Sequence, residues 1–157
     1  MTDNASGNQV IELASIDVNL SPHAFYRWAT HWYEAKRQFV PPHKFSPIPW
    51  AMLCQAIELV IKARHLTRVK QKNVKDTYRH NLTKAYSALE PNEQVLTAGE
   101  ERVLDEANAL YDAPKAFHYF RPVDALPGYK SFPDLDMLDR ITRKLLDDSH
   151  DLDLPRQ

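Results

Sequence analysis

The stretch PWAMLCQAIELVIKARHL, residues 49–66, constrains the fold of this chain more than any other. It is almost wholly apolar up to residue 63, and its polar side chains there and just beyond recur at Gln55, Glu58, Lys62 and His65. This spacing places the four side chains within an arc of about 80° on a helix. A helix that is apolar around the rest of its circumference is a buried one. The stretch therefore predicts a central bundle helix with one narrow polar line, too short and too interrupted by charge to span a bilayer.

The composition is that of a single globular domain. The chain has 157 residues, of which 43% are hydrophobic and 26% charged, and these values are ordinary for such a domain. Its 3 glycines argue against a protein rich in tight β-turns and against a glycine-rich phosphate loop. A formal net charge of -1 gives no global attraction to nucleic acid, although a local basic patch stays open.

Several kinds of chemistry lack their sequence signatures. The single cysteine, Cys54, lies in the most apolar run, so we expect a buried thiol and neither a disulfide nor a nucleophile. Paired-cysteine and HExxH motifs are absent, and a flexible tail explains the acidic residues after 146 better than a cation site does. We therefore expect no metal and no cofactor. Residues 1–20 lack the pattern of a signal peptide, so a cytoplasmic location is expected.

Helical periodicity continues on both sides of the central stretch. Ser21 and Pro22 form an N-cap and first-turn pair that opens a helix ending near Phe39. Its aromatic residues, Trp28 and Trp32 among them, follow helical spacing and are expected in the core, with base stacking as the alternative.

Three further helices are predicted downstream of the central one. A short helix capped by His80 or Asn81 stops at Pro91, the next follows the capping-box pattern at 97–100, and the last spans 134–148. The chain is thus predicted to be all-α, an antiparallel bundle of about five helices.

The remaining stretches are predicted as loops and ends. The basic run at 67–75 is expected to be a solvated loop, with a nucleic-acid patch as the alternative. The proline-rich stretch 114–130, with its aromatic centre at 117–122, is expected to be an ordered loop. The chain then divides into a flexible lead-in at 1–20, a single helical-bundle domain at 21–149 and a flexible acidic tail at 150–157.

A second polar stretch, residues 78–82 with the sequence YRHNL, follows the polar line after a short gap. Glu58 and Lys62 are an i, i+4 pair, and once covered by other helices they need further hydrogen-bond partners from this helix start. One interpretation is a polar clasp that fixes the loop onto the central helix. The other is a small anion or nucleotide pocket to which Arg79 or the basic run adds charge. The candidate residues for the two interpretations together are Gln55, Glu58, Lys62, Arg79, His80 and Asn81.

These two stretches together resemble the stand-alone HEPN (higher eukaryotes and prokaryotes nucleotide-binding) domains, over roughly residues 20–148. In that family a central helix often has the pattern HAIELxLKA, and a GHDL motif opens the next helix. The matching residues here are Ala56, Ile57, Glu58, Leu59, Lys62, Ala63, His80 and Leu82. The departures are Gln55 for His, Arg79 for Gly and Asn81 for Asp. We expect Arg79 to disfavour the left-handed backbone that a glycine would permit.

The resemblance also implies where catalysis would lie in a catalytic member. Such members are metal-independent RNases with an Arg and a His separated by four to six residues, which meet their copies across a homodimer. The His moves a proton from the ribose 2′-hydroxyl and the Arg stabilises charge on the phosphate. Two pairs have this spacing, Arg37 with His43 and Arg143 with His150, and the second lies closer to the family's position.

Three functions therefore stay open. The preferred one is a non-catalytic HEPN-like module, implied to be homodimeric, that binds a nucleotide, RNA or a protein partner. The second is a metal-independent RNase toxin of a toxin–antitoxin or defence system. The third is a purely structural subunit of another chain, and a neighbouring nucleotidyltransferase gene would indicate the paired system known for this family.

Overall fold

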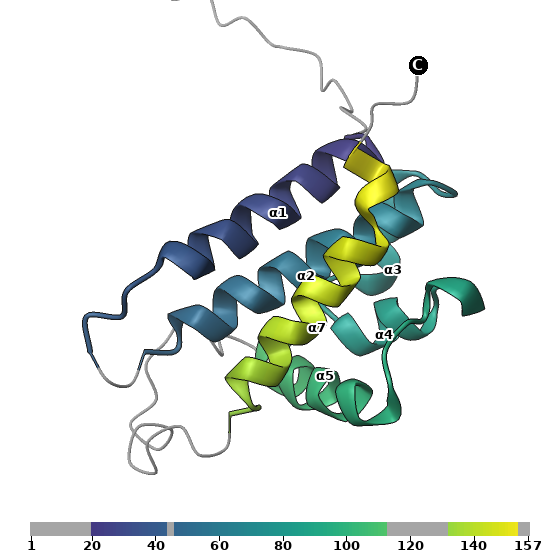
Figure 1. Cartoon of the computed structure of the whole chain (residues 1–157). Coiled ribbons are helices and arrows are strands. Elements are labelled where there is room, and N and C mark those ends of the chain that lie inside the picture. The colour runs from purple at the N-terminus through teal and green to yellow at the C-terminus, as the bar shows by residue number, and fades with distance from the viewer. Residues whose placement is uncertain (1–19, 44–45, 113–131, 154–157) are drawn as a thin grey trace, which may run out of the picture.

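A computed structural model describes residues 20–43, 46–112 and 132–153. These residues form helices and no strand, which confirms the predicted all-α bundle (Figure 1). The α-helices are α1 (Pro22–Gln38), α2 (Ile48–Leu66), α3 (Gln71–Tyr78), α4 (Leu82–Ser87), α5 (Ala98–Tyr111) and α7 (Leu135–Asp148). Two 3-10 turns, η1 (Pro91–Glu93) and η2 (His150–Asp153), complete the described part. Within it, no helix is both long enough and apolar enough to cross a membrane.

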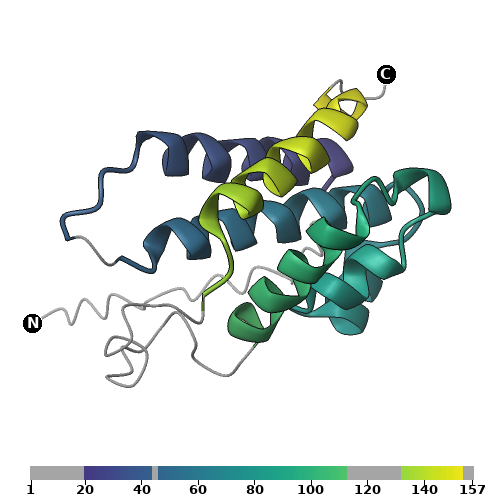
Figure 2. The same ribbon diagram turned by 60° about the horizontal axis from the view of Figure 1, so that its bottom comes forward.

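Helix α2 is the centre of the bundle, as its sequence predicts. It packs against every other α-helix of the described part, and most of its residues are buried. Figures 1 and 2 show α1 and α7 on one side of α2, and α3, α4 and α5 on the other. Helix α1 runs antiparallel to α2, whereas α7 runs in the same direction as α2 (Figure 1). Trp50 near the start of α2 bonds to the Pro133 carbonyl, and Arg64 near its end bonds to Ser149.

Helix α1 begins and ends where the sequence predicts. The Ser21 hydroxyl accepts a hydrogen bond from the Ala24 amide at 3.2 Å, and Pro22 occupies the first turn. Ala29 is fully buried against α2. The expected core position of the tryptophans is wrong, because Trp28 is 49% and Trp32 42% exposed.

Helix α3 replaces part of the loop that was predicted at 67–75. Its basic side chains point outward, while Val74 is only 2% exposed and Tyr78, one turn later, packs against the core. A helix of eight residues with one buried side chain leaves too weak a periodic pattern to be recognised among charged neighbours. The additional helix explains why the described part has six α-helices and not five.

The chain after α7 differs from the flexible tail expected at 150–157. Residues 150–153 form η2, which packs against α1. Leu152 is buried, and its carbonyl lies 3.2 Å from His23 Nδ1. Arg64 pairs with Asp151 at 2.9 Å. The expectations for residues 1–19, 154–157 and the aromatic stretch 117–122 lie outside the described residues.

Candidate functional site

Glu58 is the centre of the predicted polar cluster. It lies in the middle of α2 and is only 6% exposed. Its carboxylate accepts hydrogen bonds from Lys62 Nζ, one turn later, and from the Tyr111 hydroxyl of α5. His80 Nδ1 lies 3.2 Å from the same carboxylate, and Gln55 Oε1 lies 2.7 Å from the Tyr111 oxygen. A charge as deeply buried as this needs several donors, and here the protein supplies all of them.

Tyr111 is the member of this cluster that was not predicted as a site residue. Its ring also meets the His80 ring edge-on, with centroids 6.0 Å apart. Burial and the nearby charge of Glu58 raise the pKa of Tyr111, so the phenol stays a donor. The spacing of apolar residues in α5 indicated that Tyr111 faces inward, but its polar partner on α2 depends on tertiary packing.

Lys62 joins α2 to the turn between α3 and α4. Its ammonium donates to Glu58 and to the Arg79 carbonyl. Arg79 has φ 48° and ψ -111°, the one positive φ of a non-glycine residue in the described ranges. The sequence led us to expect that Arg79 would not adopt a positive φ at this turn, and that expectation is wrong. Two contacts hold the turn there against a strain of about 1–3 kcal/mol. Lys62 donates to the Arg79 carbonyl, and His80 lies against the Glu58 carboxylate.

Asn81 has a different task from the other five candidates. Its Oδ1 accepts from the Lys84 amide at 2.8 Å and caps α4, as one of the two predicted caps. Its Nδ2 donates to Asp112 at the end of α5, at 3.0 Å. Asn81 therefore fastens α4 to α5 and lies outside the Glu58 cluster.

The last residue of the polar line, His65, is a core residue. It is buried, its Nε2 lies 2.8 Å from the Ala85 carbonyl, and its ring stacks on Tyr78 at 4.5 Å. Burial lowers the pKa of His65, and the bond to Ala85 only partly opposes this effect. His65 thus joins α2 to α3 and α4 as a neutral imidazole at pH 7.

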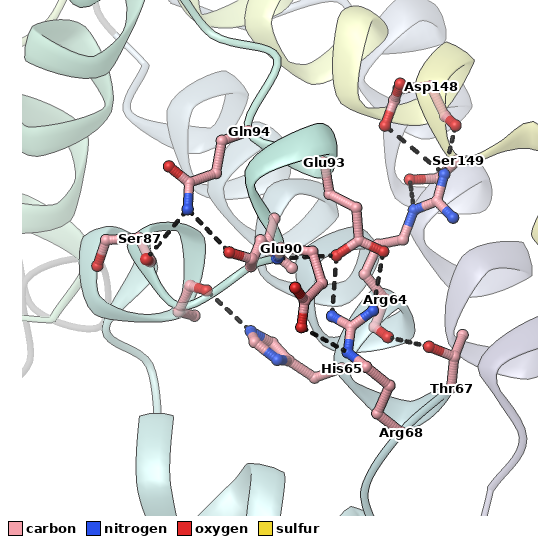
Figure 3. Close-up of polar contacts among 12 residues, drawn as sticks. Arg64, His65, Thr67, Arg68, Ser87, Glu90, Glu93, Gln94, Asp148 and Ser149 are labelled. Atoms are coloured by element: carbon pink, nitrogen blue, oxygen red, sulfur yellow. Dashed lines mark hydrogen bonds and ion pairs between the residues drawn. The ribbon is translucent and has the colours of Figure 1, made fainter.

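Two arginines beside His65 hold the far end of the bundle together (Figure 3). Arg64 donates to the Ser149 hydroxyl at 3.0 Å and to the Asp148 carbonyl at the end of α7. Arg68 forms a two-bond pair with Glu93, at 2.8 and 2.9 Å. The adjoining cavity measures about 10 Å³, too small for a ligand. This network is structural.

An open hollow lies on the outer side of the Glu58 cluster. It measures about 600 Å³ and is lined by Lys62, Lys75, Asp76, Arg79 and His80. The His80 side chain is 70% exposed there. Lys62 is already paired with Glu58, whereas the Lys75 ammonium and the Arg79 guanidinium have no ion-pair partner among the residues described. The hollow therefore carries two uncompensated cations and one carboxylate.

The predicted catalytic residues lie near the end of the described chain. Arg143 is on α7 and His150 begins η2, and both are exposed. His150 Nδ1 lies 2.9 Å from the Asp147 carbonyl. In the alternative pair, Arg37 with His43, the Arg37 guanidinium donates a hydrogen bond to Glu34 of the same helix, α1, at 3.2 Å.

No group of three or more His, Cys, Asp or Glu side chains that could hold a metal ion occurs in the described ranges. Cys54 is buried, and burial together with Glu58 raises its pKa to about 12, so its thiol stays protonated. Comparison of the chain with protein-family models, with curated proteins and with solved structures gave no significant match.

Proposed function

We propose that this chain is a non-catalytic HEPN-like helical module that binds a phosphate-bearing ligand of the nucleotide class, free or as part of RNA. The observation that carries the proposal is the hollow beside α3, where Lys75 and Arg79 lack ion-pair partners in the described structure. Lys62 lines the hollow but bonds to Glu58 and to the Arg79 carbonyl, and Glu58 bonds to Tyr111, so these two residues support the site from within the protein.

The HEPN-like assignment is supported by how the two motif stretches meet. Glu58 and Lys62 come from the stretch that resembles HAIELxLKA, and His80 from the stretch that resembles GHDL. They form one hydrogen-bonded cluster. Arg79 occupies the position of the motif glycine and has the positive φ that glycine adopts easily.

The charge of the hollow suits a phosphate better than a neutral ligand. An arginine offers paired donors to phosphate oxygens and a lysine offers a compact positive charge. Lys75 and Arg79 outnumber the single Asp76, so the hollow has a net positive charge on a chain whose net charge is -1. Attraction to phosphate is thus local to this surface.

A non-catalytic role is favoured because neither candidate RNase residue lines the hollow. Arg143 and His150 are exposed elsewhere, on α7 and η2. Lys144, next to Arg143, pairs with Glu100 and ties α7 to α5 at 2.8 Å. This ion pair gives α7 a structural role against α5.

The test measures binding of ATP by calorimetry and of a labelled single-stranded RNA of 12 nucleotides by fluorescence anisotropy, at fixed low salt. The double variant Lys75→Glu/Arg79→Glu should weaken binding at least tenfold. The matched control is Arg102→Glu/Arg140→Glu, which makes the same change of charge on exposed residues of α5 and α7 that are not candidate site residues. It should change affinity less than threefold.

Binding of ATP alone would identify a nucleotide ligand, and tight binding of RNA alone would identify RNA. Equal weakening by both double variants would contradict the proposal, since it would show that binding depends on overall charge and not on the residues of the hollow. Absence of binding to either probe by the wild-type chain would also contradict it.

A further inference from the structure

Helix α1 carries a second apolar stripe that the bundle does not cover. The core side of the helix consists of Phe25, Tyr26 and Ala29, which are buried. A different side carries Trp28 and Trp32, which are 49% and 42% exposed. The Trp28 ring leans on Phe25, with centroids 6.2 Å apart, so it is supported from within. Figure 1 shows α1 at the edge of the bundle, with α2 and α7 on its inner side.

The exposed stripe has the spacing of a helix-pairing seam. The seam consists of Ala24, Trp28, Trp32, Ala35 and Phe39. Steps of four, four, three and four residues keep these side chains within about 80° of one another on the helix. Steps of three and four are those by which one helix presents a continuous strip to a second helix. None of these five residues is fully buried in the chain itself.

Two tryptophans on one seam are costly to leave in water and are the residue type most enriched at protein–protein contacts. Each could remove a large apolar area from water if a partner covered it. The seam is therefore suited to a protein surface that is apolar and uncharged.

The charges near the seam favour a second copy of this chain over a charged partner. On the open flank the seam is bordered by His31 and Gln38, and neither is an acidic residue, a lysine or an arginine. The charged residues of α1 are paired within the chain: Arg27 with Asp153, Lys36 with Asp139, and Arg37 with Glu34. A second copy would meet no like charge, while a basic or acidic partner would find no ion to pair with.

The order of large and small residues makes the seam complementary to itself. When two α1 helices pack antiparallel with a two-fold axis between His31 and Trp32, Trp28 faces the partner's Ala35 and Phe39 faces the partner's Ala24. Large side chains then fill the space above small ones at both ends, as an interface with two-fold symmetry requires.

We infer from this pattern that α1 forms a symmetric, antiparallel homodimer interface through the seam. The interface lies on α1 and leaves the hollow beside α3 open, so the inference does not depend on what the hollow binds. It assigns the dimer to a particular surface and orientation.

The first test is light scattering on the full chain at several concentrations. The wild-type chain should be a dimer at micromolar concentration, and Trp28→Glu or Trp32→Glu should weaken association at least tenfold. Val69→Glu is the matched control, because Val69 is 42% exposed and lies between α2 and α3, away from the seam. It should leave association unchanged. A monomeric wild-type chain would overturn the inference. If its tryptophans were shielded from solvent, the seam would be covered by part of the same chain.

The second test does not remove any seam residue. His31→Cys places a thiol near the proposed axis, and Gln38→Cys places one where the two copies would be about 20 Å apart along the helices. The buried Cys54 leaves the engineered thiol as the reactive one. A short bis-maleimide should link His31→Cys dimers and not Gln38→Cys dimers. Equal linking of both, or of neither, would overturn the antiparallel seam.

Discussion

The Tyr111 hydroxyl at the end of α5 donates a hydrogen bond to the Glu58 carboxylate in the middle of α2. This bond joins two helices that lie on either side of the cluster and covers a carboxylate that is almost fully buried. Tyr111→Phe should lower the free energy of unfolding by about 1–3 kcal/mol, because the buried carboxylate loses a donor. Urea unfolding measures the change.

Tyr33→Phe is the control for this prediction. Tyr33 also donates to a carboxylate, that of Asp139 at 3.1 Å, but the Asp139 side chain is 26% exposed and water can replace the lost donor. Its effect should be the smaller of the two. A smaller loss for Tyr111→Phe than for Tyr33→Phe would show that the Glu58 cluster is not the tightly held clasp described above.

The Glu58–Lys62 pair should behave as a buried ion pair. Glu58→Gln alone should destabilise the fold by about 3–5 kcal/mol, because it leaves the Lys62 ammonium without its counter-charge. Adding Lys62→Met should restore part of that loss, since two apolar or neutral side chains need no charge compensation. A double-mutant cycle gives the coupling energy, and simple additivity of the two effects would argue against a coupled pair.

The strained turn at Arg79 predicts a substitution that stabilises the fold, whereas the changes at Tyr111 and Glu58 destabilise it. Arg79→Gly should raise stability by up to about 1 kcal/mol, because the relief of a positive φ outweighs the greater entropy of glycine in the unfolded chain. Arg79→Ala removes the same guanidinium and keeps the strain, so it should not stabilise. Thermal unfolding of the two variants separates backbone strain from side-chain charge; a more stable alanine than glycine variant would contradict the assignment.

Burial of His65 makes stability depend on pH. Its pKa in the folded chain lies below the ordinary value of 6.5, so the unfolded chain binds more protons between the two values. This contribution to stability is complete above pH 6.5 and is lost as the pH falls below it. Urea unfolding from pH 7.5 to 5.5 should show the decline, and His65→Gln should flatten it. An equal decline in the variant would assign the effect to another group.

The helices follow closely from local signals in the sequence. The caps at Ser21, Asn81 and Thr97 and the apolar run of α2 are properties of neighbouring residues, and they set the bounds of α1, α4, α5 and α2. Helix α3 was missed because Val74 alone marks its buried side. The tryptophans of α1 were misplaced because helical spacing shows that residues share a side, not which side meets the core.

The candidate site follows from the sequence only in part. The narrow polar line on an otherwise apolar helix predicts that Glu58 and Lys62 meet polar partners, and the motif stretch predicts His80 as one of them. Tyr111 and Lys75 come from elements whose position against α2 depends on packing over long separations in the chain. Arg79 was judged by its own preference, whereas the bonds of its neighbours decide its backbone.

The most direct test of the proposed function is to incubate the wild-type chain with a labelled single-stranded RNA and measure bound fraction and RNA length on the same sample. The account predicts that the RNA stays intact, and that any RNA bound by the wild-type chain is no longer bound by Lys75→Glu/Arg79→Glu. Cleavage of the RNA that disappears in Arg143→Ala or His150→Ala would contradict it.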